Sequence, residues 1–152
     1  MKSYEIIEHT ADIGIKVWGK TLKQLFQHAA MGMFYILYPE SHSADRIPNH
    51  SLCSDTSQLP HSITIKKELE SFEELLVYWL SELLYIFNTK DILFSRFNIV
   101  KLSNGSLNAQ VFGKEIDISV NPPAIEIKAV TFHNLKIQKD KNIFYTSIIF
   151  DV

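Results

Sequence analysis

The hydrophobic pattern of this chain changes period near residue 90, and that change limits the folds it can adopt. Before it, apolar residues recur at helical spacing over two stretches, each with one face suited to burial. Thr21 with Gln24, and Ser71 with Glu74, have the capping-box spacing that opens a helix. The apolar positions are Leu22, Leu25, Phe26, Ala29, Met33 and Leu37 in the first stretch, and Leu75, Leu76, Trp79, Leu80, Leu83, Leu84 and Phe87 in the second. We therefore predict two amphipathic helices, the second capped by Asn88.

After residue 90 the pattern is typical of strands joined by hairpins. Asn104-Gly105 lies between two apolar stretches and is a strong hairpin signal, and residues 139–142 join the last two strands. The strands predicted after residue 90 are residues 92–102, 106–112, 114–119, 125–137 and 143–151, and three more are predicted before it, over residues 4–7, 13–18 and 63–69. Hairpin-connected strands are antiparallel, and the helices and strands follow one another without a repeat. We therefore expect a single α+β domain over residues 1–152. It should have a mainly antiparallel β-sheet with both amphipathic helices packed on one face.

Composition and charge narrow the class of protein. A chain of 152 residues with 46% hydrophobic residues can form one domain with a sizeable core. The formal net charge of −2 argues against direct nucleic-acid binding, which usually needs a basic surplus. Cys53 is the only cysteine, which fits a reducing compartment. With no apolar run of membrane-helix length and no signal-peptide core, we expect a soluble cytoplasmic protein.

Residues 40–62 differ from the rest of the chain in composition. They contain two prolines, three histidines and many Ser, Asp and Asn residues, with few large apolar side chains. Such a segment contributes little to a core, and we predict a surface loop whose shortening leaves thermal stability nearly unchanged. His42, His50 and His61 match no zinc-binding spacing and are expected to be exposed loop residues.

Two aspartates near strand ends are the main candidate functional residues. Asp12 lies between two predicted strands, and Asp151 is followed only by Val152, whose α-carboxylate adds a second negative charge. If the first and last strands lie side by side, these oxygens form one cluster, which favours Ca²⁺ or Mg²⁺ over zinc. The alternatives are that Asp12 bonds its own turn and that Asp151 simply solubilises a chain end.

Three further residues have both a functional and a structural interpretation. His9 is near Asp12 in sequence and forms either an acid–base pair with it or hydrogen bonds that tie the turn. His133 lies within a predicted alternating strand, where a packed or hydrogen-bonded histidine is common. Lys128, in the same otherwise apolar segment, must project its ammonium group towards water or an anion.

Several segments together resemble the archease family. They are Glu8-His9-Thr10-Ala11-Asp12-Ile13-Gly14, Gly19-Lys20-Thr21-Leu22 running into Leu25-Phe26 and Ala29-Ala30, Leu83-Leu84-Tyr85-Ile86-Phe87, Lys128-Ala129-Val130-Thr131-Phe132-His133, and Phe150-Asp151-Val152. The resemblance extends over most of the chain except residues 40–62, and the first and last motifs together are its specific part.

This resemblance implies a small cytoplasmic α+β protein that activates the GTP-dependent RNA-splicing ligase, which seals tRNA halves and other RNA ends. The activator would promote guanylylation of the ligase and its multiple turnover, would meet RNA only through the ligase, and would not itself be catalytic. The resemblance also implies a divalent metal ion, Ca²⁺ or Mg²⁺, held by Asp12, Asp151 and the Val152 terminus. Lys128 would be a partner or nucleotide contact, and we group His9 and His133 with it.

Two features depart from the family pattern. The segment 40–62 is longer than usual, and Asn88 stands where family members often have aspartate. Two other functions use the same residues differently. The first is a stand-alone metal-dependent hydrolase that works through the same carboxylates, and the second is a chaperone or scaffold without a metal.

Overall fold

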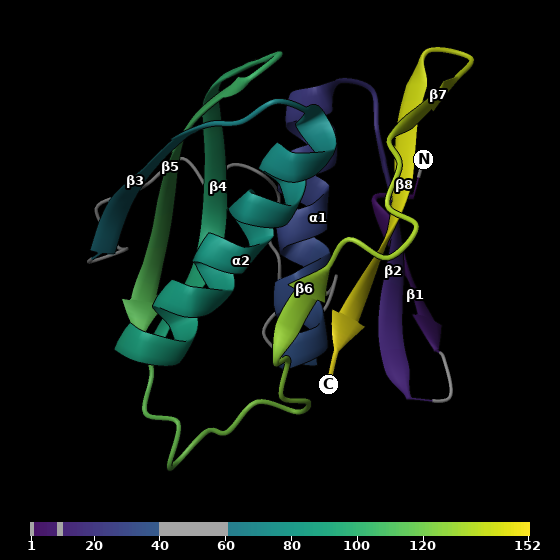
Figure 1. Ribbon diagram of the computed structural model, residues 1–152. Coiled ribbons are helices and arrows are strands. Elements are labelled where there is room, and N and C mark those ends of the chain that lie inside the picture. Colours follow the sequence, from purple (N-terminus) through teal and green to yellow (C-terminus); the bar gives the residue numbers. More distant parts are fainter. Residues whose placement is uncertain (1, 9–10, 40–60) are drawn as a thin grey trace.

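Two antiparallel sheets lie on either side of a helix in the described part of the chain (Figure 1). The structure is a computed structural model, and it describes residues 2–8, 11–39 and 61–152. Its elements in chain order are β1 (Tyr4–Glu8), β2 (Asp12–Gly19), α1 (Leu22–Leu37), β3 (His61–Glu68), α2 (Phe72–Lys90), β4 (Ile92–Ser103), β5 (Ser106–Glu115), β6 (Ala129–Thr131), β7 (Gln138–Asp140) and β8 (Ile143–Asp151).

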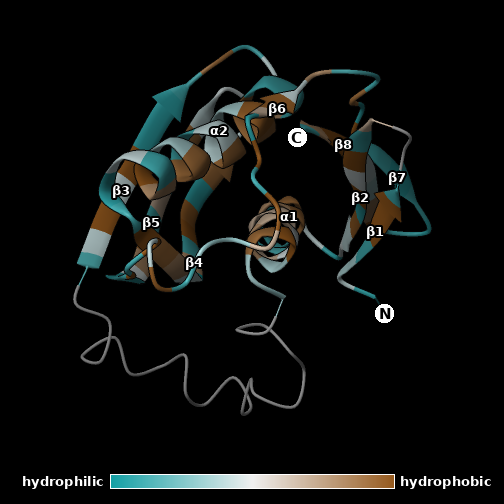
Figure 2. Ribbon diagram, turned by 90° about the horizontal axis from the view of Figure 1, so that it is seen from below, coloured by the Kyte–Doolittle hydropathy of each residue, from teal (hydrophilic) through white to brown (hydrophobic). Residues whose placement is uncertain are grey.

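The strands are divided between a larger and a smaller sheet. The larger has the order β1-β2-β8-β6, with β7 also paired to β8, and the smaller has the order β3-β5-β4. The predicted α+β class, with two helices and antiparallel strand pairing, is confirmed among the described residues. The prediction of one sheet with both helices on one face is corrected, because the strands form two sheets. Figure 2 shows α1 end-on between them.

The central position of α1 follows from its composition. Its buried residues are Leu25, Phe26, Ala29, Ala30, Gly32, Met33, Phe34, Ile36 and Leu37. A helix that is apolar around most of its circumference must be covered on more than one side. On one side, the ring of Phe34 lies 5.9 Å from that of Phe94 and 5.8 Å from that of Phe97, both on β4. On the other, Gly32 faces Ile15 of β2 and Tyr4 of β1.

Both predicted helix starts are confirmed by side-chain caps. The Thr21 hydroxyl accepts a hydrogen bond from the Gln24 N–H at 3.0 Å, and the Gln24 side chain accepts one from the Lys20 N–H at 2.6 Å. Ser71 accepts in the same way from the Glu74 N–H at 3.1 Å. These bonds satisfy backbone donors that have no partner within the helix.

The end of α2 lies beyond the predicted cap. Asn88 is inside the helix, which runs to Lys90, and Asp91 is the cap, with a left-handed backbone (φ 54°) and its N–H bonded to the Phe87 carbonyl. Within the last turn the Thr89 hydroxyl donates to the Tyr85 carbonyl at 2.8 Å, so this side chain is bonded inside the helix and does not form a competing turn.

The long strand predicted over residues 125–137 is wrong. Only the short strand β6 forms there, and β7 follows it after a turn. Asn134 has a positive φ of 53°, and the Leu135 N–H bonds to the Phe132 carbonyl at 3.0 Å. The chain therefore turns inside a segment whose alternating pattern is typical of a strand.

The short strand predicted over residues 114–119 is also wrong. Its first two residues instead complete β5, which ends at Glu115. Asp117 then accepts hydrogen bonds from the N–H and the hydroxyl of Ser119, an Asx-type turn that ends extended backbone.

Most of the loop predicted over residues 40–62, including His42 and His50, lies outside the described residues. At its end the prediction is corrected, because His61 and Ser62 begin β3, opposite Gly113 and Phe112 of β5. Pairing with β5 extends the strand into a segment that composition assigns to the loop. No helix in the described ranges has both the length and the apolar character needed to cross a membrane.

His28 links α1 to β2 and introduces a pH dependence. Its Nδ1 lies 2.6 Å from the Trp18 carbonyl oxygen, which can only accept, so this nitrogen carries the proton. Burial lowers the pKa of His28 from its ordinary value of 6.5, and the hydrogen bond to Trp18 opposes that shift without cancelling it. Below pH 6.5, therefore, the unfolded chain takes up a proton at this position more readily than the folded one.

We expect the free energy of unfolding to fall as the pH drops below 6.5, because proton uptake there favours the unfolded state. His28→Gln should flatten this slope between about pH 5 and pH 7, the range around the ordinary pKa of histidine. Urea unfolding followed by circular dichroism at several pH values measures it. A slope that is unchanged in the variant would assign the pH dependence to other groups.

Candidate metal and partner site

Asp12 and Asp151 lie directly opposite each other at one end of the larger sheet. β2 begins at Asp12, β8 ends at Asp151, and the two residues are register partners. The predicted adjacency of the two aspartates is confirmed, although the neighbour of the last strand is β2 and not β1. Residues directly opposite in an antiparallel pair project from the same face of a sheet. Figure 1 marks the C-terminus at this end of the molecule, beside β6.

The backbone bonding of β8 brings the two aspartates close. The carbonyl of Asp151 accepts from the Lys128 N–H at 2.7 Å, and the carbonyl of Ile149 accepts from the Thr131 hydroxyl at 3.0 Å. Both carbonyls thus face the β6 side, and in an antiparallel strand the N–H of a residue faces the same way as its C=O. Asp12 and Asp151 therefore form a non-hydrogen-bonded pair, in which Cα atoms lie about 4.5 Å apart.

Gly14 permits the close approach of β2 and β8 beside this pair. A Cβ atom at Gly14 would lie 3.0 Å from Cδ1 of Ile149 and 3.2 Å from the carbonyl oxygen of Ile148. A larger residue here, two positions from Asp12, would require the Ile149 side chain and the β8 backbone to shift by a few tenths of an ångström. The Asp12-Ile13-Gly14 sequence therefore combines the acid with the residue that lets its partner strand approach.

The donor chemistry here fits a hard cation. Asp151 is exposed and Asp12 half-buried, and neither forms an ion pair among the residues that the structure describes. Within residues 2–8, 11–39 and 61–152 no group of three or more His, Cys, Asp or Glu side chains is close enough to share a metal ion. Two carboxylates, completed by the Val152 α-carboxylate or by water, suit Ca²⁺ or Mg²⁺ better than zinc.

Lys128 lies next to the acidic pair and beside a groove between α2 and β6. Ala129 is the register partner of Asp151, and Val130 packs towards the core opposite Phe150. Lys128 directly precedes β6, and its N–H bonds to the Asp151 carbonyl. Its side chain is exposed and lines a groove of about 240 Å³. The residues around this groove are Ser81, Leu84, Tyr85, Asn88, Lys128, Ala129 and Val130.

Of the two histidines grouped with Lys128, the structure describes only His133. His9 lies outside the described residues. His133 is exposed in the turn after β6, where its Nε2 lies 3.3 Å from Nδ2 of Asn134. Because β6 runs away from Asp151 after Ala129, the structure does not bring His133 to the acidic pair.

The groove contains two residues that sequence reasoning did not select. Tyr85 lies on α2 and is 62% exposed. Its position off the apolar stripe of α2 was the available signal, since a tyrosine there must face outward. Asn88 lies in the same groove as Lys128.

The fold and this site define a small α+β protein with a helix between two antiparallel sheets and an acidic strand pair at an open sheet end. Residues 4–152 match the Archease protein family (MTH1598/TM1083). The chain belongs to this family, which confirms the resemblance seen in its motifs.

Relatives and solved structures of the family agree over nearly the full chain. The archease of Methanosarcina barkeri is 35% identical, covering 99% of this chain and 97% of its own. The archease of Pyrococcus furiosus is 30% identical over 91% of this chain and 90% of its own. The solution structure of Methanobacterium thermoautotrophicum protein 1598 has a TM-score of 0.68 at 29% identity and covers 100% of both chains. A Thermotoga maritima crystal structure, titled an archease and possible chaperone, shares the fold with a TM-score of 0.58 at 20% identity, over 96% of this chain and 94% of its own.

Proposed function

We propose that this protein is a non-catalytic activator of the GTP-dependent RNA-splicing ligase, acting in the cytoplasm. It would promote guanylylation of the ligase and its multiple turnover in tRNA splicing and other RNA end joining. The observation that carries the proposal is the register pairing of Asp12 with Asp151 beside the C-terminus, in a chain of the Archease family. An acidic pair at the end of a sheet is accessible to a partner and has no internal ion pair among the described residues.

In this proposal Asp12, Asp151 and the Val152 α-carboxylate bind one divalent cation and present it to the ligase. The cation would offset the negative charge of the GTP phosphates during nucleotidyl transfer. The part of this chain is positional, because β2 and β8 fix both carboxylates on one face of the sheet. Lys128, on the α2 side of β6, would contact the ligase or a phosphate through the neighbouring groove.

Guanylylation of the cognate ligase, followed with labelled GTP and Mg²⁺, tests this proposal. With RNA ends present, we expect the protein to raise both the rate of guanylylation and the number of ligations per ligase molecule. No stimulation would refute the proposal. A parallel reaction without ligase addresses the hydrolase alternative, since consumption of GTP or RNA there assigns catalysis to this chain. The chaperone alternative predicts slower loss of ligase activity on heating and no faster guanylylation of native ligase.

Lys128→Ala should keep the fold and impair ligase activation, because an exposed lysine without an ion pair among the described residues contributes little to stability. We expect the melting temperature to change little and stimulation to fall several-fold. Lys101→Ala removes another exposed lysine, from β4 in the other sheet, and should leave stimulation unchanged. Full activation by a folded Lys128→Ala protein would show that this lysine has no role at the partner.

A further inference from the structure

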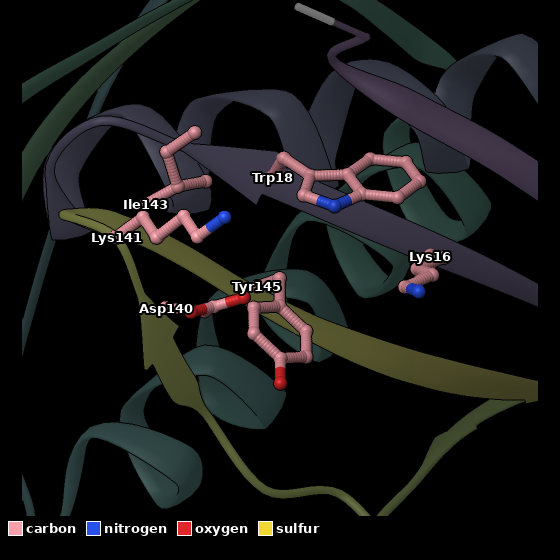
Figure 3. Close-up of a pocket in the computed structure, with 6 residues that line it drawn as sticks. All are labelled: Lys16, Trp18, Asp140, Lys141, Ile143 and Tyr145. Atoms are coloured by element: carbon pink, nitrogen blue, oxygen red, sulfur yellow. The ribbon is translucent and has the colours of Figure 1, made fainter.

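A second site lies at the other end of the β2–β8 pair. Trp18 and Tyr145 are register partners there. Their neighbours Val17 and Thr146 are buried, so the two aromatic side chains project from the opposite, outer face of the sheet. Both rings line an open pocket of about 320 Å³, together with Lys16, Asp140, Lys141 and Ile143. Figure 3 shows these side chains.

The Lys16 ammonium group is held by the rings and not by an acid. Its Nζ lies 5.2 Å from the centre of the Trp18 ring and 5.6 Å from that of Tyr145. Within the described residues no carboxylate forms an ion pair with it. A lysine kept only by cation–π contacts can turn its charge to an anion that binds at the rings. Lys141, on the other side of the pocket in Figure 3, supplies a second positive charge.

We propose that this pocket binds one nucleotide unit, with its base on the Trp18 and Tyr145 rings and its phosphate on Lys16 or Lys141. Aromatic side chains beside basic groups are the general means of binding unpaired bases. The Asp140 carboxylate can accept a hydrogen bond from an amino group of the base. With a net charge of −2 the chain lacks the basic surplus that a long phosphate track requires, so the site is suited to one nucleotide and not to a duplex.

A purely structural role for these rings makes a different prediction. Cross-strand aromatic pairs stabilise antiparallel sheets, and that effect would need no ligand. The pocket also lies at the far end of β2 from Asp12, a separation of six residues along the strand. Ligand binding at this pocket can therefore be tested without a ligase. The result of that test does not depend on whether the protein activates a ligase.

Tryptophan fluorescence reports on this pocket directly. Trp79, the other tryptophan of the chain, is fully buried, and its indole N–H donates to the Phe26 carbonyl at 3.0 Å. Quenching by a ligand should therefore come from Trp18 and be absent in Trp18→Phe. The probes are guanosine monophosphate, a short single-stranded oligoadenylate RNA, and inorganic tripolyphosphate, which carries phosphate without a base. We expect saturable quenching by the first two and none by tripolyphosphate.

Variants of the pocket complete the test. Tyr145→Ala should raise the dissociation constant about tenfold, the typical loss when one stacking ring is removed, and Tyr145→Phe should bind like the parent. Lys16→Ala should weaken binding several-fold and Lys16→Arg should retain it. Lys139→Ala is the matched control, because its ammonium lies 5.2 Å from the ring of Phe144, which packs towards the core.

If the RNA binds more tightly than the mononucleotide, the natural ligand of the pocket is an RNA end. If the two bind equally, the natural ligand is a free nucleotide. Equal quenching by tripolyphosphate, no quenching by any nucleotide, or wild-type affinity in folded Tyr145→Ala and Lys16→Ala would overturn the proposal.

Discussion

Replacing Asp12 or Asp151 by alanine is expected to abolish most of the ligase activation while leaving the fold intact. The two carboxylates are register partners in a close pair, with the Val152 α-carboxylate one residue away. Ligand charge sets the affinity of oxygen sites for hard cations, so loss of one carboxylate should weaken Ca²⁺ binding strongly. A tenfold loss corresponds to about 1.4 kcal/mol, and we expect at least that much.

The same substitutions should not destabilise the metal-free protein. Crowded carboxylates repel each other unless a cation neutralises them, so removing one relieves repulsion. We therefore expect the metal-free Asp12→Ala and Asp151→Ala proteins to unfold at or above the temperature of the metal-free parent. Added Ca²⁺ should raise the melting temperature of the parent more than that of either variant, because binding to the folded state stabilises it.

Calorimetric titration with Ca²⁺ and Mg²⁺, run beside the guanylylation assay, measures both effects. Asp12→Asn and Asp151→Asn keep the side-chain volume and should behave like the alanine variants, which separates charge from packing. Glu68→Gln is a control, since it removes one exposed carboxylate at the end of β3, in the other sheet. If the aspartate variants bind metal and activate like the parent, the proposed site is wrong and activation must depend on another surface.

Phe34→Ala is expected to lower the free energy of unfolding by about 3–5 kcal/mol, the usual range for a buried phenylalanine. Phe34 is fully buried on α1, the helix that packs between the two sheets. Its ring contacts those of Phe87 on α2 at 6.1 Å, and of Phe94 and Phe97 on β4 at 5.9 and 5.8 Å. Truncation would leave a cavity that these rigid rings cannot fill, and would remove their aromatic contacts.

Urea unfolding at 25 °C, followed by circular dichroism, measures this loss. Tyr85→Ala is a suitable control, because it also removes an aromatic ring from a helix but one that is 62% exposed. It should change the free energy of unfolding by less than about 0.5 kcal/mol. A loss of under 1 kcal/mol in Phe34→Ala would mean that the surrounding rings repack, and that α1 is a less rigid link between the sheets than its contacts indicate.

Local signals in the sequence located most of the secondary structure. The capping boxes at Thr21 and Ser71 gave both helix starts, since a cap involves residues only three positions apart. Asn104-Gly105 gave the β4–β5 hairpin, in which Gly105 has the positive φ of 96° that the turn requires. Where a competing local turn was not recognised, as at Asn134, the alternating pattern predicted too long a strand.

The sequence by itself determined the α+β class, the two helices, and the motifs by which the chain resembles its family. Only the tertiary structure decided that the strands form two sheets, that Asp12 faces Asp151, and that Lys128 faces the groove beside α2. It also placed Trp18 beside Tyr145, although they are far apart in sequence. The physical reason is that capping and turn preferences act between near neighbours. Strand partners and register instead depend on which faces the folded chain buries together.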